Sequence, residues 1–267
     1  MNKTRIDIHE HLVANPSGHR PLYADLYRPG QADANGNPAV VLVYGGSWRS
    51  GERSQQKVYG LALAKAGFVC LAAEHRFSTE AKWPAQLDDV RTAVRWLRAH
   101  AREFNIDPER IAISGNSSGG HLALMVAAAG CDSFPLSREE GEWGEFSSQV
   151  KAVCAFYPPT KLDGLDNDNH DDSVRALLGA GAARADYERA SPLTFATQPF
   201  PPVVLLSGSD DQRVPVEQTY QLHQALEQTG NTVEMHVFAG QGHAFDADRD
   251  MARVSATVIV NFFQRYV

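Results

Sequence analysis

Short apolar runs that alternate with helix-patterned segments constrain the fold of this chain most. The apolar runs lie at Ala39–Tyr44, Phe68–Glu74, Arg110–Ser114, Val150–Tyr157, Pro202–Gly208 and Val233–Ala239. Continuous runs of this kind are typical of strands that are buried on both faces. Segments with a helical pattern separate most of them, at Ser54–Gly67, Pro84–Phe104, Ser118–Ala129, Val216–Gln228 and Ala252–Val267. This alternation predicts an α/β fold with a mostly parallel central sheet, flanked by helices on both faces.

The rest of the chain is compatible with a single domain over residues 1–267. Alternating residues at Arg5–Val13 and Leu22–Tyr27 predict an antiparallel strand pair ahead of the parallel sheet. We find no internal repeat and no linker with the composition of a domain boundary. Two loop-rich stretches, 131–149 and 158–202, depart from the alternation. Long loops in a compact domain are often lids or binding loops, so a small lid region and plain surface loops both stay open.

Charge and composition narrow the class of partner. A net charge of −7 disfavours nucleic acid, because phosphate binding needs a basic surface. The sequence has no apolar window of about 18 residues, so we expect no membrane span, and its first residues lack the apolar core of a secretory signal. The three cysteines, Cys70, Cys131 and Cys154, lack disulfide or zinc-site spacing. We therefore expect a reduced, cytoplasmic protein, as a monomer or a homodimer.

A glycine-rich junction between a predicted strand and a predicted helix carries the first chemical signal. Gly115-Asn116-Ser117-Ser118-Gly119 matches the pattern G-x-S-x-G. Flanking glycines allow the sharp turn that lifts the central serine clear of a sheet, so Ser117 is a candidate nucleophile. The start of a helix also favours developing negative charge. The alternative is a serine that caps the helix, followed by glycines that permit close packing.

A serine hydroxyl needs a base, and the base needs a carboxylate that orients it. In this architecture the expected chain order is serine, acid, histidine, with each residue just after a strand. The run at Pro202–Gly208 is followed by Asp210 and Asp211, and the run at Val233–Ala239 is followed by His243. The order and the context both agree, so His243 is the candidate base and one of the two aspartates is the candidate acid.

A turn after the first long strand supplies candidate donors for an oxyanion. Gly45, Gly46 and Ser47 form a glycine-rich turn with backbone N–H groups, which stabilise negative charge where it develops in the transition state. A phosphate loop with G-x-x-x-x-G spacing is the competing interpretation. Glu52 and Arg53 stand where that loop needs lysine and serine or threonine, and a carboxylate there would repel phosphate.

Together these motifs resemble a known family, the α/β-hydrolase carboxylesterases. The resemblance is to the branch of hormone-sensitive-lipase-like and bacterial feruloyl-esterase-like enzymes, and it extends from about Leu22 onward. The segments that carry it are "YGGSW", "EHRFSTEAKWPAQLDDVRTAVRWLR", "GNSSGGHL", "SGSDDQRVP" and "GQGHAFD". The resemblance implies the α/β-hydrolase fold and a catalytic triad without a cofactor.

The family pattern assigns the triad by position. Ser117 matches the nucleophile and His243 the base, while the acid of the family stands three residues before Val-Pro. Val214-Pro215 therefore selects Asp211 over Asp210, which remains the alternative acid.

The implied oxyanion donors are the N–H groups of Gly46, Ser47 and Ser118. This chain departs from the family at several supporting positions. Tyr44 replaces a common histidine, Ser47 a glycine, Ser118 an alanine and Ser207 a histidine. The backbone donors are unaffected, so the departures bear on the support of the loop and on the acyl-side preference.

The function that follows is a serine carboxylesterase that hydrolyses short-chain or small aromatic esters through an acyl-enzyme. Its expected partner is a small-molecule ester. Alternatives are an arylformamidase-like amide hydrolase and a catalytically inactive hydrolase fold that serves in binding. Trp48 is expected either to line the acyl pocket or to lie in the core. We expect no metal, because residues 165–172 lack the spacing of an EF-hand loop and His9 with His11 gives only two ligands.

Overall fold

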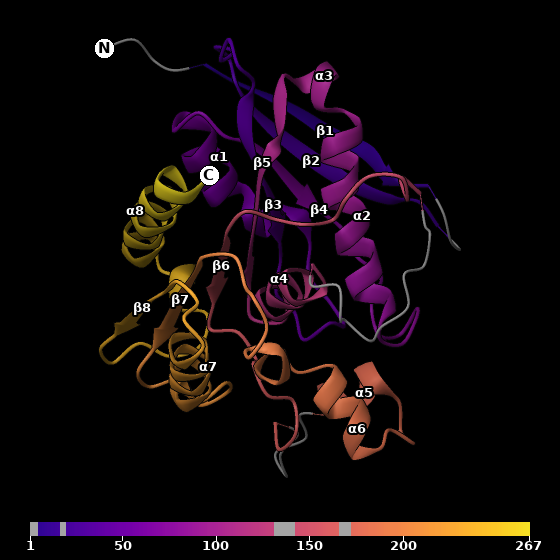
Figure 1. Ribbon diagram of the computed structural model, residues 1–267, viewed down its shortest axis with the longest axis vertical. Coiled ribbons are helices and arrows are strands. Elements are labelled where there is room, and N and C mark those ends of the chain that lie inside the picture. Colours follow the sequence, from indigo (N-terminus) through magenta and orange to yellow (C-terminus); the bar gives the residue numbers. More distant parts are fainter. Residues whose placement is uncertain (1–4, 17–19, 131–141, 166–171) are drawn as a thin grey trace.

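A single twisted sheet organises the chain (Figure 1). The structure is a computed structural model that describes residues 5–16, 20–130, 142–165 and 172–267. Within these ranges eight strands form the order β1-β2-β4-β3-β5-β6-β7-β8. Strand β2 runs antiparallel to both of its neighbours, β1 and β4. The six strands β3 to β8 are parallel to one another. The strands are β1 (Ile6–Asn15), β2 (Leu22–Pro29), β3 (Asn37–Val43), β4 (Val69–Ala73), β5 (Ile106–Asn116), β6 (Val153–Phe156), β7 (Val203–Gly208) and β8 (Val233–Phe238).

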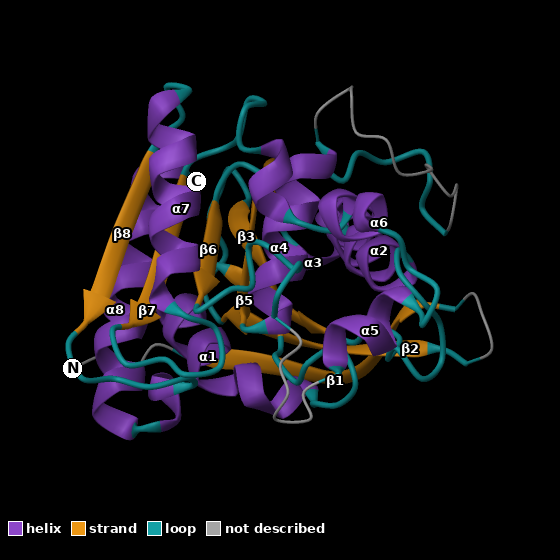
Figure 2. Cartoon of the chain, turned by 90° about the horizontal axis from the view of Figure 1, so that it is seen from below, coloured by secondary structure: helices purple, strands orange, loops and turns teal. Residues whose placement is uncertain are grey.

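Helices cover both faces of this sheet (Figure 2). On one face α2, α4 and α7 pack on alternate strand residues, and on the other face α1 and α8 pack on the intervening ones. The helices are α1 (Lys57–Lys65), α2 (Ala85–Ala99), α3 (Ala101–Phe104), α4 (Ser118–Ala129), α5 (Ser173–Leu178), α6 (Arg184–Arg189), α7 (Val216–Gln228) and α8 (Arg249–Tyr266). The prediction of an α/β fold with a mostly parallel, doubly covered sheet is confirmed.

The helix predicted over Pro84–Phe104 is wrong in its extent. It ends at Ala99, and α3 follows as a separate short helix. At His100 the backbone leaves helical geometry, with φ −99° and ψ 16°, while the imidazole stacks on Trp96 with ring centroids 4.1 Å apart. Asn105 then adopts a left-handed conformation with φ 54°, which ends α3 and turns the chain into β5.

The two predicted lid segments lie only partly within the described ranges. Residues 131–141 and 166–171 fall outside them. The described part of 158–202 contains α5, α6 and a short 3-10 helix at Pro192–Phe195. The start of α5 lies close to the predicted nucleophile, because Ser173, Val174 and Ser117 line one hollow. A lid role and the single-domain division both stay predictions.

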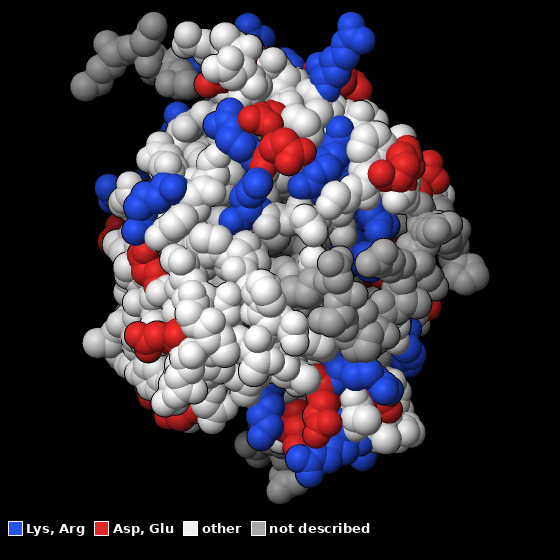
Figure 3. Space-filling model, viewed as in Figure 1, with Lys and Arg blue, Asp and Glu red and all other residues white. Residues whose placement is uncertain are grey.

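The surface and the helices add two observations. On the face shown in Figure 3, Lys and Arg are interspersed with Asp and Glu. Over α6 the opposite charges form ion pairs, Arg184 with Glu188 and Arg189 with Asp186. Among the described residues, no helix is both long enough and apolar enough to cross a bilayer.

Candidate active site

A strained turn between β5 and α4 presents Ser117. Its backbone has φ 52° and ψ −120°, a conformation that side-chain-bearing residues rarely adopt. The flanking glycines are required sterically. A Cβ on Gly115 would lie 2.3 Å from the carbonyl oxygen of Gly119, and a Cβ on Gly119 would lie 2.2 Å from that of Val43. Such close approach lets the turn pack against the end of β3 and holds the Ser117 hydroxyl above the sheet.

The structure brings the hydroxyl, the imidazole and one carboxylate into a chain of hydrogen bonds. Ser117 Oγ lies 2.9 Å from His243 Nε2, and His243 Nδ1 lies 2.7 Å from Asp211 Oδ2. Because a carboxylate only accepts, Nδ1 carries the proton, and Nε2 is left to accept the proton of Ser117. This arrangement can activate the hydroxyl as a nucleophile.

Asp211 is held as a buried acceptor. Its side chain is 0% exposed, and its Oδ1 accepts the backbone N–H groups of Arg213 and Val214, both at 2.9 Å. With Oδ2 on His243, both carboxylate oxygens are bonded, which fixes the orientation of the imidazole. Asp210 is exposed and accepts from the side chain of Gln212 at 3.2 Å. Of the two aspartates that the sequence leaves open, Asp211 is the one that contacts the histidine.

The glycine-rich turn after β3 lies directly against the serine. A Cβ on Gly45 would meet the carbonyl oxygen of Asn116 at 2.8 Å and the Cβ of Ser117 at 3.2 Å. Gly46, Ser47 and Trp48 follow with positive φ values of 140°, 56° and 57°. Consecutive left-handed residues curl the backbone, and Gly46 and Ser47 line a cavity with Ser117. The predicted oxyanion residues therefore lie beside the predicted nucleophile, with Ser118 at the start of α4.

The Trp48 side chain holds this turn against the core. It is 2% exposed, and its indole Nε1 donates to His121 Nδ1 at 3.2 Å. His121 Nε2 then donates to the carbonyl oxygen of Ala190 at 2.7 Å. Burial disfavours the charged imidazole and lowers the pKa of His121 to about 4, so it stays neutral. Trp48 is thus a core residue that also lines a hollow next to Ser117, and its role in an acyl pocket stays a prediction.

Sequence reasoning missed a second carboxylate near the base. Asp246 Oδ2 accepts from Tyr59 at 2.6 Å and from Asn116 Nδ2 at 2.5 Å, and its Oδ1 accepts from Tyr157 at 2.5 Å. Burial and the nearby Asp246 raise the pKa of Tyr157, so its hydroxyl remains a donor. Tyr157 packs edge-on against His243, with ring centroids 4.7 Å apart. Asp246 therefore links Asn116, the residue before Ser117, to the loop that carries His243. The only sequence signal is its place three residues after His243.

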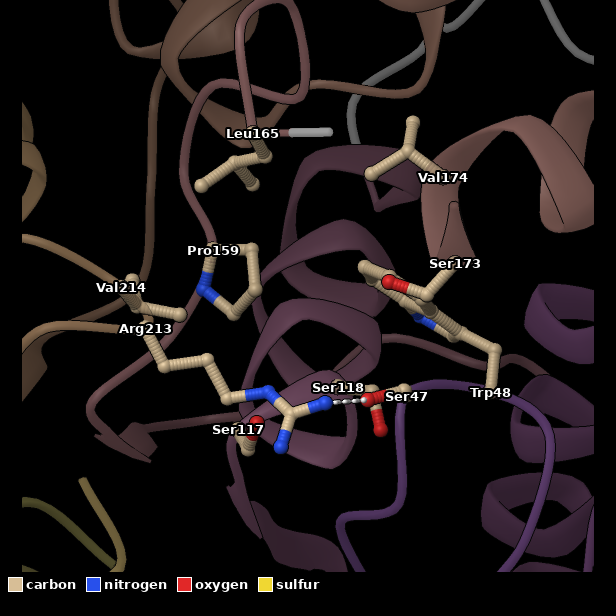
Figure 4. Close-up of a pocket in the computed structure, with 10 residues that line it drawn as sticks. All are labelled: Ser47, Trp48, Ser117, Ser118, Pro159, Leu165, Ser173, Val174, Arg213 and Val214. Carbon is tan, nitrogen blue, oxygen red and sulfur yellow. Dashed lines mark hydrogen bonds between the residues drawn. The ribbon is translucent and has the colours of Figure 1, made fainter. Parts of the chain in front are cut away.

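Ser117 lines a smaller and a larger hollow formed by described residues. The smaller one has a volume of about 20 Å³ and is shown in Figure 4; it is lined by Ser47, Trp48, Ser117, Ser118, Pro159, Leu165, Ser173, Val174, Arg213 and Val214. The larger one, of about 470 Å³, lies on the side of His243, Tyr157 and Asp246. Arg213 lines both hollows. Among the described residues no group of three or more His, Cys, Asp or Glu side chains is placed to hold a metal ion.

Comparison with known proteins identifies the family. The BD-FAE family matches residues 24–226, about three quarters of the chain. The chain belongs to the BD-FAE family. These domains are feruloyl-esterase-like α/β-hydrolases, in agreement with the predicted resemblance.

Curated relatives of the chain carry esterase names. The chain is 30% identical to the probable carboxylic ester hydrolase LipM of Mycobacterium tuberculosis, over 85% of this chain and 54% of LipM. It is 29% identical to the esterase LipQ of the same organism, over 92% of this chain and 60% of LipQ. The chain therefore spans 54% to 60% of the length of these relatives.

Solved structures match almost end to end. A truncated carbohydrate esterase from gut microbiota is 25% identical, with a TM-score of 0.84 and coverage of 99% of this chain and 98% of that one. Thermogutta terrifontis esterase 2 is 27% identical, with a TM-score of 0.80 and coverage of 99% and 95%. The predicted α/β-hydrolase fold is confirmed, and the solved structures that it resembles over almost their whole length are esterases.

Proposed function

We propose that this protein is a serine carboxylesterase for small-molecule esters with short acyl groups. The observation that carries the proposal is the hydrogen-bonded chain from Ser117 through His243 to Asp211, at 2.9 Å and 2.7 Å, beside the turn at Gly46 and Ser47. A hydroxyl, a correctly oriented base and nearby backbone donors are what acyl transfer to a serine requires.

In the proposed mechanism Ser117 Oγ attacks the ester carbonyl while its proton passes to His243 Nε2. The carbonyl oxygen becomes an oxyanion, which the N–H groups of Gly46, Ser47 and Ser118 stabilise. Collapse of this intermediate breaks the bond to the alcohol, which leaves with the proton from His243. Water, deprotonated by the same imidazole, then hydrolyses the acyl-enzyme and regenerates Ser117.

In this proposal the alcohol part and the acyl part of the ester occupy different hollows. The leaving alcohol must reach the proton on His243, so it belongs in the larger hollow of about 470 Å³ that His243 lines. We assign the acyl group to the hollow of about 20 Å³ beside Trp48, because Ser117 and the predicted oxyanion donors Ser47 and Ser118 line it together. This asymmetry supports short acyl groups with larger alcohols. Thermogutta terrifontis esterase 2, which is 27% identical, has been solved with propionate and with butyrate bound.

Hydrolysis of 4-nitrophenyl esters of increasing acyl length, compared with N-formylkynurenine, tests the proposal. We expect acetate to butyrate to be preferred over octanoate, and Ser117→Ala to lower kcat by about 10⁵-fold. Preference for N-formylkynurenine would instead favour an arylformamidase-like amide hydrolase. Lack of turnover of every ester would favour a binding protein with a hydrolase fold.

Two further properties belong to the proposal. Cys70 and Cys154 are buried free thiols, which support a reducing, cytoplasmic environment. Fractionation of cells that produce the native protein tests the cytoplasmic location. Light scattering on the purified protein distinguishes the monomer from the homodimer.

A further inference from the structure

The position of Arg213 carries an inference about substrate charge, and it rests on the proposed esterase function. We propose that the site prefers esters whose alcohol part bears a carboxylate, that is, short-chain O-acyl derivatives of hydroxy acids, and that Arg213 binds this carboxylate.

The Arg213 side chain is fixed at both ends relative to the reacting atoms. Its backbone N–H donates to Asp211 Oδ1 at 2.9 Å, so its Cα is tied to the candidate triad acid. Its Nη2 donates to Ser47 Oγ at 3.1 Å, so the guanidinium is tied to the oxyanion turn. Figure 4 shows the side chain reaching across to Ser47 with Ser117 close to the guanidinium.

The lining of the larger hollow includes one positively charged side chain, that of Arg213. Among its lining residues, Arg213 is the one Lys or Arg within the described chain, and Asp246 is the one Asp or Glu. Asp246 already accepts from Tyr59, Asn116 and Tyr157. A guanidinium has five N–H donors and binds carboxylates through two parallel hydrogen bonds. The alcohol side of the site therefore has the chemistry to bind an anion.

The sizes of the two hollows favour a carboxylate on the alcohol part of the substrate rather than on the acyl part. The hollow beside Trp48, of about 20 Å³, is the tighter of the two and leaves less space for an added carboxylate. The hollow of about 470 Å³ on the His243 side accommodates an aromatic hydroxy acid, and Arg213 stands at its boundary with Ser117.

The experiment compares 4-acetoxybenzoate with its neutral analogue 4-acetoxybenzamide in wild type, Arg213→Gln and Arg213→Lys. The intrinsic reactivity of each ester is the same for every variant, so it cancels when the acid-to-amide ratio of kcat/KM is compared between variants. We expect Arg213→Gln to lower the acid-to-amide ratio by about tenfold, chiefly through KM, and Arg213→Lys to fall between. Salt should reduce the wild-type ratio, because the guanidinium is exposed. Arg253→Gln, an exposed arginine on α8, controls for the change in net charge.

The outcomes separate this proposal from the esterase function. Turnover of both esters with an unchanged ratio in Arg213→Gln would overturn the role of Arg213 and leave the esterase standing, as would an equal loss for both esters. Turnover of neither ester by wild type would count against the esterase itself. Binding of 4-acetoxybenzoate to Ser117→Ala, with and without Arg213→Gln, needs no catalysis: we expect Kd to rise about tenfold, and an equal Kd would overturn the proposal.

Discussion

Gly119→Ala tests whether close packing of the turn on β3 creates the site. The added Cβ would lie 2.2 Å from the carbonyl oxygen of Val43 and 2.5 Å from that of Tyr44. Ordinary contact begins at 3.4 Å, so the first approach is about 1.2 Å too short, and both obstacles are backbone. The start of α4 and the end of β3 must therefore separate.

The separation has two measurable costs. Strain of this size in a well-packed core destabilises a protein by about 1–3 kcal/mol. The backbone that moves carries Ser117 and Ser118 on one side and the turn at Gly46 on the other. A displacement of about 1 Å between reacting groups lowers catalytic efficiency by about 100-fold. We expect both losses together.

Urea unfolding and kcat/KM for 4-nitrophenyl acetate measure the two effects. Gly181→Ala is the matched control, because a Cβ there meets nothing within 4 Å and its φ is not in the left-handed range. We expect the control to keep both properties. Gly119→Ala with stability and kcat/KM close to wild type would refute the packing account of the turn.

Three other predictions follow from single contacts. Asp211→Asn should lower kcat by about 10⁴-fold, because the imidazole loses the acceptor that sets its tautomer. Steady-state kinetics with 4-nitrophenyl acetate measure this loss, and an unchanged kcat contradicts the prediction. The pKa of His121 is lowered from 6.5 to about 4, so the unfolded chain binds this proton first. Stability should therefore fall by about 3 kcal/mol as pH drops from 6.5 to 4, and urea titrations should show a flatter profile for His121→Gln. Asp246→Asn should lower kcat by about tenfold and destabilise the protein by about 1–3 kcal/mol, since the new amide group faces donors from Tyr59 and Asn116. Thermal unfolding that matches wild type would argue against a structural role for Asp246.

The order of elements and the three candidate catalytic residues could be predicted because their signals are local. Apolar runs mark the buried strands, and Ser117, Asp211 and His243 each follow the end of one. In a parallel sheet these ends lie at the same edge, so position along the chain already implies proximity in space. The structure adds the distances, and it shows that Asp211, which the family pattern selects, contacts His243 while Asp210 accepts from Gln212.

The supporting contacts could not be predicted because their partners are distant in sequence. Trp48 and His121 are 73 positions apart, and Asn116 and Asp246 are 130 apart. No pattern in a single sequence pairs such residues, since each pairing depends on how the helices pack. The break at His100 has a similar cause, because stacking on Trp96 and the entry into β5 override a good helical pattern.

Covalent labelling tests the central claim most directly. A fluorophosphonate reacts with an activated serine hydroxyl, and Thermogutta terrifontis esterase 2 has been solved phosphonylated by sarin. Mass spectrometry of the labelled, digested protein should find one adduct, on the peptide with Ser117, and Asp211→Asn should slow its formation. An unlabelled Ser117 under conditions that label a control esterase, or an adduct on another serine, would contradict the account.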